Sequence, residues 1–176
     1  MRPALNAIYK GSGLLAGFFL VAIAVLSLTQ IAERLLGIAS HSYDEFAGYC
    51  MAASSFLGLA WTLRCNEHIR MTLAIGRLRG GRRRAIEVLC LVAAVAIVGF
   101  FAWASVRMVW TSYALDDVSQ GLVPVKLWIP QSGMALGLVV LLLAIVDDLL
   151  VALRGGETSY AIAEAAKAGG SPGFER

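Results

Sequence analysis

The sequence is poor in the residues that build redox sites. Its 176 residues include three cysteines, Cys50, Cys65 and Cys90, and these are isolated from one another. A membrane thiol oxidoreductase would need a close pair such as C-x-x-C, so this spacing disfavours that chemistry. We expect the three thiols to be buried or reduced.

Charge is scarce as well. Only 15% of the residues are Asp, Glu, Lys or Arg, whereas 59% are hydrophobic, which is well beyond the apolar share of a soluble domain. The net charge of +3 comes from arginines that suit anionic lipid headgroups, and it gives no reason to expect nucleic acid as a partner. The composition therefore predicts a membrane protein.

Four apolar stretches are long enough to cross the roughly 30 Å hydrocarbon core, which takes about 20 mostly apolar residues in a helix. A β-barrel is disfavoured, because a run such as LGLVVLLLAIV would line the barrel lumen with leucine. We expect an all-α fold, an integral membrane bundle of four transmembrane helices. The expected spans are roughly Gly13–Ile31, Phe46–Leu63, Val88–Val106 and Leu127–Val146.

The basic residues predict the orientation, because Lys and Arg near the ends of spans are retained on the cytoplasmic side. Twelve of the fifteen lie near the amino terminus, after the second span or in the tail: Arg2, Lys10, Arg64, Arg70, Arg77, Arg79, Arg82, Arg83, Arg84, Arg154, Lys167 and Arg176. The two other connections hold Arg34, Arg107 and Lys126 together with Glu33, Asp44, Glu45, Asp116 and Asp117. Both termini are expected in the cytoplasm, and two acidic loops are expected to face outward.

Small residues predict where the helices pack, because helices associate in lipid through close backbone approach. The candidate faces are the G-x-x-x-G pairs Gly13/Gly17 and Gly133/Gly137, the pair Ser54/Gly58, and the face with Gly48, Ala52 and Ser55. We expect helix contacts on each of these faces.

Asp147 and Asp148 interrupt the last apolar run near its cytoplasmic end. Acidic residues in mid-membrane would indicate an ion or proton pathway, but this pair lies about one helix length from Trp128. We expect both carboxylates at the interface, within reach of water. Residues 1–154 are expected to form one four-span domain, and residues 155–176 a mobile cytoplasmic tail.

The stretch RCNEHIRMTL, directly after the second span, places Arg64, Glu67, His68 and Arg70 within seven positions. In helical spacing these side chains can pair with one another at i,i+3 and i,i+4. The mixed basic and apolar residues that follow fit a short interfacial segment that lies along the inner headgroups between the second and third helices. The expected roles are anchoring to anionic lipid headgroups or docking onto another membrane subunit.

No catalytic, cofactor or metal site is predicted. The two histidines, His41 and His68, lie on opposite sides of the membrane in the expected topology, so a metal ion would lack ligands. Four-helix membrane cytochromes hold haem through histidines inside their spans, and neither histidine is in one. The groups near His68 are two arginines and a glutamate, which do not form a nucleophile and base.

The order of these features resembles a known family. The stretches DEFAGYCMAASSFLGLAWTLRCNEHIRMTL and LWIPQSGMALG, with the Arg-rich loop between them, are similar to the DctQ-like small membrane subunit of tripartite ATP-independent periplasmic (TRAP) transporters. The most distinctive part is the H-I-R step at residues 68–70. The family pattern commonly continues as H-I-R-V-D, whereas Met71 and Thr72 follow here, so an acidic residue is missing.

The resemblance implies a partner system in the bacterial inner membrane. A large multi-span subunit would carry the substrate and sodium sites, and a periplasmic solute-binding protein would deliver an organic acid. The small subunit would brace the scaffold of the large one during uptake driven by an ion gradient. Asp44, Glu45, Asp116 and Asp117 in the outer loops could dock the binding protein. The alternatives are a redox subunit similar to cytochrome b and a free-standing sensor or channel, and the transported solute is left open.

Overall fold

The structure, a computed structural model, describes residues 2–37, 43–64, 81–121 and 123–154. Four long helices account for most of these residues: α1 (Arg2–Leu35), α2 (Tyr43–Arg64), α4 (Gly81–Ala114) and α5 (Trp128–Leu153). Each of the four is long and apolar enough to cross a membrane, which confirms the predicted all-α membrane fold. The predicted interfacial segment and the tail after residue 154 lie outside the described residues.

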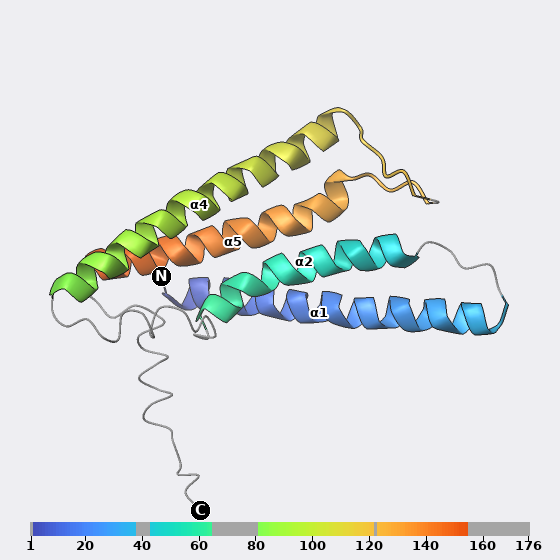
Figure 1. The fold of residues 1–176 in the computed structure, drawn as a ribbon, viewed down its shortest axis with the longest axis horizontal. Helices are drawn as coiled ribbons and strands as arrows, with labels where there is room; N and C mark the ends of the chain where they lie inside the picture. Colours follow the sequence, from blue (N-terminus) through green and yellow to red (C-terminus); the bar gives the residue numbers. More distant parts are fainter. Residues whose placement is uncertain (1, 38–42, 65–80, 122, 155–176) are drawn as a thin grey trace, which may run out of the picture.

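The four helices lie side by side in one row (Figure 1). The helix α2 packs against both α1 and α5, and α5 packs in turn against α4. The order across the row is therefore α1, α2, α5, α4, with α2 and α5 in the centre and α1 and α4 at the edges. The end of α1, the start of α2, the end of α4 and the start of α5 lie at one end of the row, here called the loop end (Figure 1). The start of α1 and the end of α5 lie at the other, the terminal end.

The helices are longer than the predicted spans. The apolar helical segments of α4 and α5 that are long enough to cross a membrane extend to Ala114 and Leu153, past the predicted span ends at Val106 and Val146. Arg107, predicted to lie in an outer connection, is therefore inside α4. Hydropathy drops at the first charged residue, but the helix continues because its backbone N–H and C=O groups have no other partners in lipid.

The centre of the row is held by close backbone contact between α2 and α5. A Cβ atom on Gly137 would lie 2.6 Å from the Phe56 carbonyl oxygen, and one on Gly133 would lie 3.0 Å from the Ala53 Cβ. Glycine lets two helix backbones approach this closely because it carries no side chain. The packing predicted for the Gly133/Gly137 pair is confirmed.

A second set of small residues joins α1 to α2. A Cβ atom on Gly58 would lie 3.6 Å from the Ala16 Cβ. The Ser54 hydroxyl donates a hydrogen bond to the Ala16 carbonyl oxygen at 2.9 Å. The packing predicted for the Ser54/Gly58 pair is therefore also confirmed.

Two other predicted faces pack only in part or remain open within the chain. Gly13 packs against the Trp61 side chain, but Gly17 in the same motif has open space around it. Gly48 also has open space around it, and Ser55 is exposed. The helix contact predicted for that face is therefore not made within this chain. Such a motif shows where another helix can approach closely, but it does not show which helix lies there.

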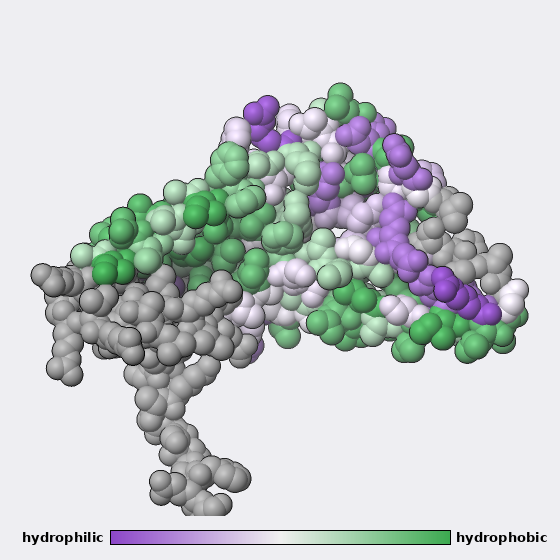
Figure 2. All heavy atoms as spheres, viewed as in Figure 1, coloured by the Kyte–Doolittle hydropathy of each residue, from purple (hydrophilic) through white to green (hydrophobic). Residues whose placement is uncertain are grey.

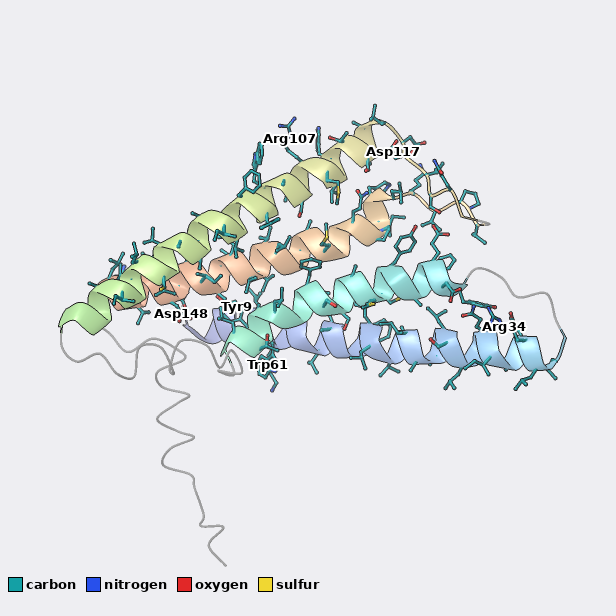
Figure 3. All side chains as sticks on the ribbon, in the orientation of Figure 1. Tyr9, Arg34, Trp61, Arg107, Asp117 and Asp148 are labelled. Atoms are coloured by element: carbon teal, nitrogen blue, oxygen red, sulfur yellow. The ribbon has the colours of Figure 1, made fainter. Side chains whose placement is uncertain are left out.

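Asp148 is buried at the terminal end of the row. It is 2% exposed, so the prediction that its carboxylate reaches water is wrong. The helix α5 runs past this residue to Leu153, so Asp148 lies inside the helix and not at its end. Tyr9 of α1, 1% exposed, belongs to a packed cluster with Ala144 and Ile145 of α5, and Figure 3 places Tyr9 and Asp148 at the same end.

Candidate functional site

Hydrophilic residues of the described chain gather at the loop end, as Figure 2 shows. The four residues predicted to dock a binding protein all lie here. Asp44 and Glu45 occupy the first turn of α2, where the partial positive charge of the helix N-terminus favours acidic groups. Asp116 and Asp117 follow the end of α4. The fold thus brings the two acidic connections to one end of the molecule, as predicted.

The connection between α4 and α5 folds back on itself. It begins with Asp116 at φ 52°, a left-handed conformation that Asp tolerates because its short polar side chain can hydrogen-bond locally. Val118 and Lys126 then form an antiparallel bridge, and the Ser119 N–H donates to the Val125 carbonyl at 2.8 Å. These contacts give the connection a defined shape above the ends of the two helices.

Glu45 ties this connection to α2. Its carboxylate accepts one hydrogen bond from the Ser119 hydroxyl and another from the Tyr49 hydroxyl, the latter at 2.5 Å. The carboxylate also lies so close to Gly121 that a Cβ atom there would overlap it. Glu45 is therefore engaged within the chain, although the sequence predicted it as a docking group. The pairing joins residues 74 positions apart, which no local pattern signals.

Asp116 forms an ion pair with Lys126, with 2.9 Å between Oδ1 and Nζ. The hydrogen bond from Lys126 to Asp116, and the charge of that carboxylate, raise the pKa of Lys126 above its ordinary value. Both side chains are more than half exposed, so water screens the pair and its contribution to stability is small. Asp44 is exposed and Asp117 partly exposed. Asp44, Asp116 and Asp117 are thus the docking candidates that an outside partner can reach.

A further polar contact joins α1 to α2 at the loop end. The Tyr43 hydroxyl donates a hydrogen bond to the Glu33 carboxylate at 2.7 Å. Such bonds between helices contribute to association in lipid. Sequence reasoning missed this contact because it treated Glu33 only as one of the charges of an outer loop.

Two hollows open between the helices in the half of the row nearer the loop end. One, of about 490 Å³, lies among α1, α2 and α5, with Phe19, Phe46 and Leu136 in its wall. The other, of about 420 Å³, lies between α4 and α5 and is bounded by Trp110 and Trp128. No charged side chain of the described residues lines either hollow. Both are suited to apolar contact.

The predicted cluster of Arg64, Glu67, His68 and Arg70 stays a prediction. Arg64 is the last residue of α2, which places its backbone at the terminal end. Its side chain and the other three residues lie outside what the structure describes.

The comparison with protein families covers three of the four described helices in full. The model of a family described as "Tripartite ATP-independent periplasmic transporters, DctQ component" matches residues 23–155, which include the second part of α1 and all of α2, α4 and α5. No curated protein and no solved structure matches the chain significantly. The family consists of transporter components and is not an enzyme family. Because the match spans well over half of the chain, the protein belongs to the DctQ family of TRAP transporter components.

Proposed function

We propose that this protein braces the scaffold of the large membrane subunit of a TRAP transporter. Family membership makes it a small permease subunit and implies association with a large membrane subunit and a periplasmic binding protein. The observation that carries the bracing role is the apolar lining of both hollows, which no charged side chain of the described residues enters. An anionic solute would need polar or charged partners inside the membrane, and these walls favour contact with lipid or another subunit instead.

In this proposal the large subunit holds the solute and the coupling ion. The binding protein delivers an organic acid, and an ion gradient drives uptake without ATP. The small subunit widens the fixed part of the assembly while a separate element moves. The α2–α5 contact supports that role, because backbones that meet at Gly133 and Gly137 leave little room for one helix to slide along the other.

Reconstitution tests this function. The small and large subunits, together and separately, are placed in proteoliposomes with the binding protein, and uptake of carboxylates and sugar acids is measured under an inward sodium gradient. We expect uptake with both membrane subunits and none with the small subunit alone. Uptake by the small subunit alone, or a large subunit that is fully stable and active without it, contradicts the proposal.

The proposal places the terminal end in the cytoplasm of a bacterial inner membrane. Its support is the distribution of basic residues, since Lys10 and Arg154 and the arginines at the start of α4 belong to that end. The test uses a chain without its three native cysteines and with a single cysteine at either Asp44 or Arg154. A membrane-impermeant thiol reagent added to intact cells with a permeabilised outer membrane should label position 44 and spare position 154. The reverse labelling contradicts this orientation.

We also propose that the acidic loop end docks the binding protein through Asp44, Asp116 and Asp117, with Glu45 acting indirectly by holding the α4–α5 connection. Exposed charges at an interface mainly steer association. Neutralising the three aspartates to asparagine should therefore lower the association rate of the binding protein about tenfold at low salt. Unchanged docking and unchanged uptake contradict this role.

For the terminal end we propose that Arg64, Glu67, His68 and Arg70 stabilise assembly with the large subunit, and that the basic segment contacts anionic lipid headgroups. Replacing both His68 and Arg70 by alanine should reduce the recovery of the small subunit with its partner. Normal recovery of the complex together with normal uptake contradicts the assembly role.

A further inference from the structure

Arg107 is a charged residue inside a membrane-crossing helix. It lies within the apolar segment Val88–Ala114 of α4, about 10 Å along the axis from the end of that helix, given a rise of 1.5 Å per residue. Its side chain is exposed and projects from α4 on the side away from α5 (Figure 3). Since α4 is an edge helix, the guanidinium group lies on the outside of the row. An ionised group in such a position is costly unless it has a partner.

The guanidinium group is turned toward the middle of the apolar span. Its Cζ atom lies over the Trp103 ring, 5.2 Å from the ring centroid, and Trp103 is one helical turn closer to the centre of α4. An arginine near the end of a span usually extends its charged head toward the nearer headgroup layer. Arg107 extends the other way, because helical side chains lean toward the helix N-terminus, and in α4 that direction leads away from the loop end.

No carboxylate of the described residues pairs with Arg107. At the loop end Asp116 is paired with Lys126, and Asp147 and Asp148 lie near the other end of the row, in the last turns of α5. The Trp103 ring covers one face of the guanidinium group. The N–H donors point outward in the plane of the group, so they can bind a planar acceptor such as a carboxylate in a bidentate manner.

Arg107 belongs to a continuous exposed strip on α4. The strip consists of Ala93, Ala96, Phe100, Trp103, Arg107 and Trp110, which are all exposed. These positions alternate in spacing between three and four residues, the spacing along which two helices pack, and alanines allow a partner helix to approach closely. Contact with lipid would leave the same residues exposed. The guanidinium group of Arg107, and the direction in which it points, therefore distinguish a partner helix from lipid as the neighbour of the strip.

We propose that this α4 strip docks against a membrane helix of the large subunit that presents a carboxylate at the depth of Arg107. The inference rests on the proposed function, because it takes the large subunit as the partner. Charge complementarity identifies the occupant: the guanidinium group lies over Trp103, on the side away from the nearer helix end, where an Asp or Glu side chain on a neighbouring helix can meet it. The opposite edge helix, α1, exposes Phe18, Val21 and Leu28 over its middle and suits lipid.

Photo-crosslinking in native membranes tests which edge faces the large subunit. A photoactivatable residue replaces Ala96 or Phe100 on α4 or, as the matched control, Val21 or Leu28 on α1, in the full chain co-expressed with the large subunit. We expect adducts of the two subunits from the α4 positions and none from the α1 positions. Adducts from α1 alone, or from neither helix while the subunits still co-purify, overturn the inference and leave the proposed function standing. A wild-type pair that does not co-purify overturns both.

Charge variants test the role of Arg107 itself. Arg107→Gln should lower the amount of large subunit retained on the tagged small subunit about tenfold, because the partner carboxylate loses its charge-assisted hydrogen bonds. Arg107→Lys should restore part of the retention, since lysine keeps the charge and loses the planar fork. Lys126→Gln, which removes a cation already paired with Asp116, is the matched control and should leave retention unchanged. Equal retention in all variants, with less phospholipid bound to Arg107→Gln, would assign Arg107 to a lipid headgroup and overturn the docking surface.

Discussion

The helix α5 in the centre of the row and the helix α1 at its edge differ most in how much of their surface the chain itself covers, whereas α2 and α4 are alike at 17%. In the most apolar part of α5, 44% of the residues are buried, against 6% in α1. A soluble protein could not leave α1 so open, but lipid tails are as apolar as the side chains that they contact. The buried residues of α1, such as Tyr9 and Ala16, lie on one side of the helix, and its packing along α2 holds it in place.

This difference separates the residues that hold the row together from those that can meet a partner. The glycine contacts between α2 and α5 are internal, and a change there alters the fold. The outer faces of α1 and α4 can vary in composition while the row stays intact. They do vary, since α4 carries Arg107 and Trp103 in contact, whereas α1 exposes aliphatic residues and phenylalanine. The comparison predicts that substitutions in the centre reduce stability and that substitutions on the edges alter assembly.

Filling the central contact should have the largest effect. Gly137→Val places a branched side chain at a point where even a Cβ atom would lie 2.6 Å from the Phe56 carbonyl oxygen. Because backbone cannot move aside as a flexible side chain can, the free energy of unfolding should fall by about 3 kcal/mol or more. Thermal unfolding in detergent, followed by circular dichroism, measures it.

The matched control is Gly17→Val on α1. Gly17 also belongs to a G-x-x-x-G pair, but no atom of a neighbouring helix lies near it. This variant should unfold at the wild-type temperature. If both variants were equally stable, the α2–α5 contact would not be what holds the centre of the row.

Releasing the α4–α5 connection from α2 should have the second-largest effect. Glu45→Ala removes the acceptor that binds the hydroxyls of Ser119 and Tyr49. Amide hydrogen exchange over residues 117–121 and 123–127 should become about tenfold faster, and the thermal midpoint should fall by about 2–4 °C. Asp44→Ala, which removes an exposed carboxylate from the same turn and loses the same interaction with the helix N-terminus, should leave the exchange of the connection unchanged. Unaltered exchange in Glu45→Ala would show that the connection is held by other contacts.

The features that sequence reasoning found depend on residues close together in the chain. The four apolar spans and the Gly133/Gly137 motif are of this kind. The Glu45–Ser119 contact could not be predicted, because it depends on how the α4–α5 connection turns and on where α2 lies beside it. Both glycines of the Gly133/Gly137 pair contact α2, whereas Gly17 of the Gly13/Gly17 pair has no neighbour. The order of the helices in the row decides which glycines have one. Arg107 lies inside α4 and not in a connection, because hydrogen bonding continues the helix past this charged residue to Ala114.

Removing the hydrogen bond between α2 and α1 should have a smaller effect. Ser54→Ala deletes the donor to the Ala16 carbonyl oxygen and keeps a small side chain at the contact, so the free energy of unfolding should fall by about 0.6 kcal/mol. Denaturant unfolding in mixed micelles measures it. Ser55→Ala, on the exposed side of the same helix, should match the wild type. A loss several times larger than this would show that the edge helix α1 depends on a single polar contact more than on packing.

The smallest effect is expected for the ion pair between Lys126 and Asp116 at the loop end. Its hydrogen bond raises the pKa of Lys126, so any stability that it adds is fully present below the unfolded-state pKa of about 10.4 and is lost only as the pH rises through the higher folded value. Between pH 6 and pH 9 the pair should therefore add no pH dependence to the free energy of unfolding.

Because both side chains are mostly exposed, Lys126→Met should shift the thermal midpoint by less than about 1 °C at pH 6 and at pH 9. A wild-type midpoint that falls over this range while that of Lys126→Met stays constant would mean that the lysine titrates there, and would contradict the raised pKa. Equal midpoints of the wild type and Lys126→Met would place the ordering of the connection with the Glu45 contact instead of with the exposed charges beside it.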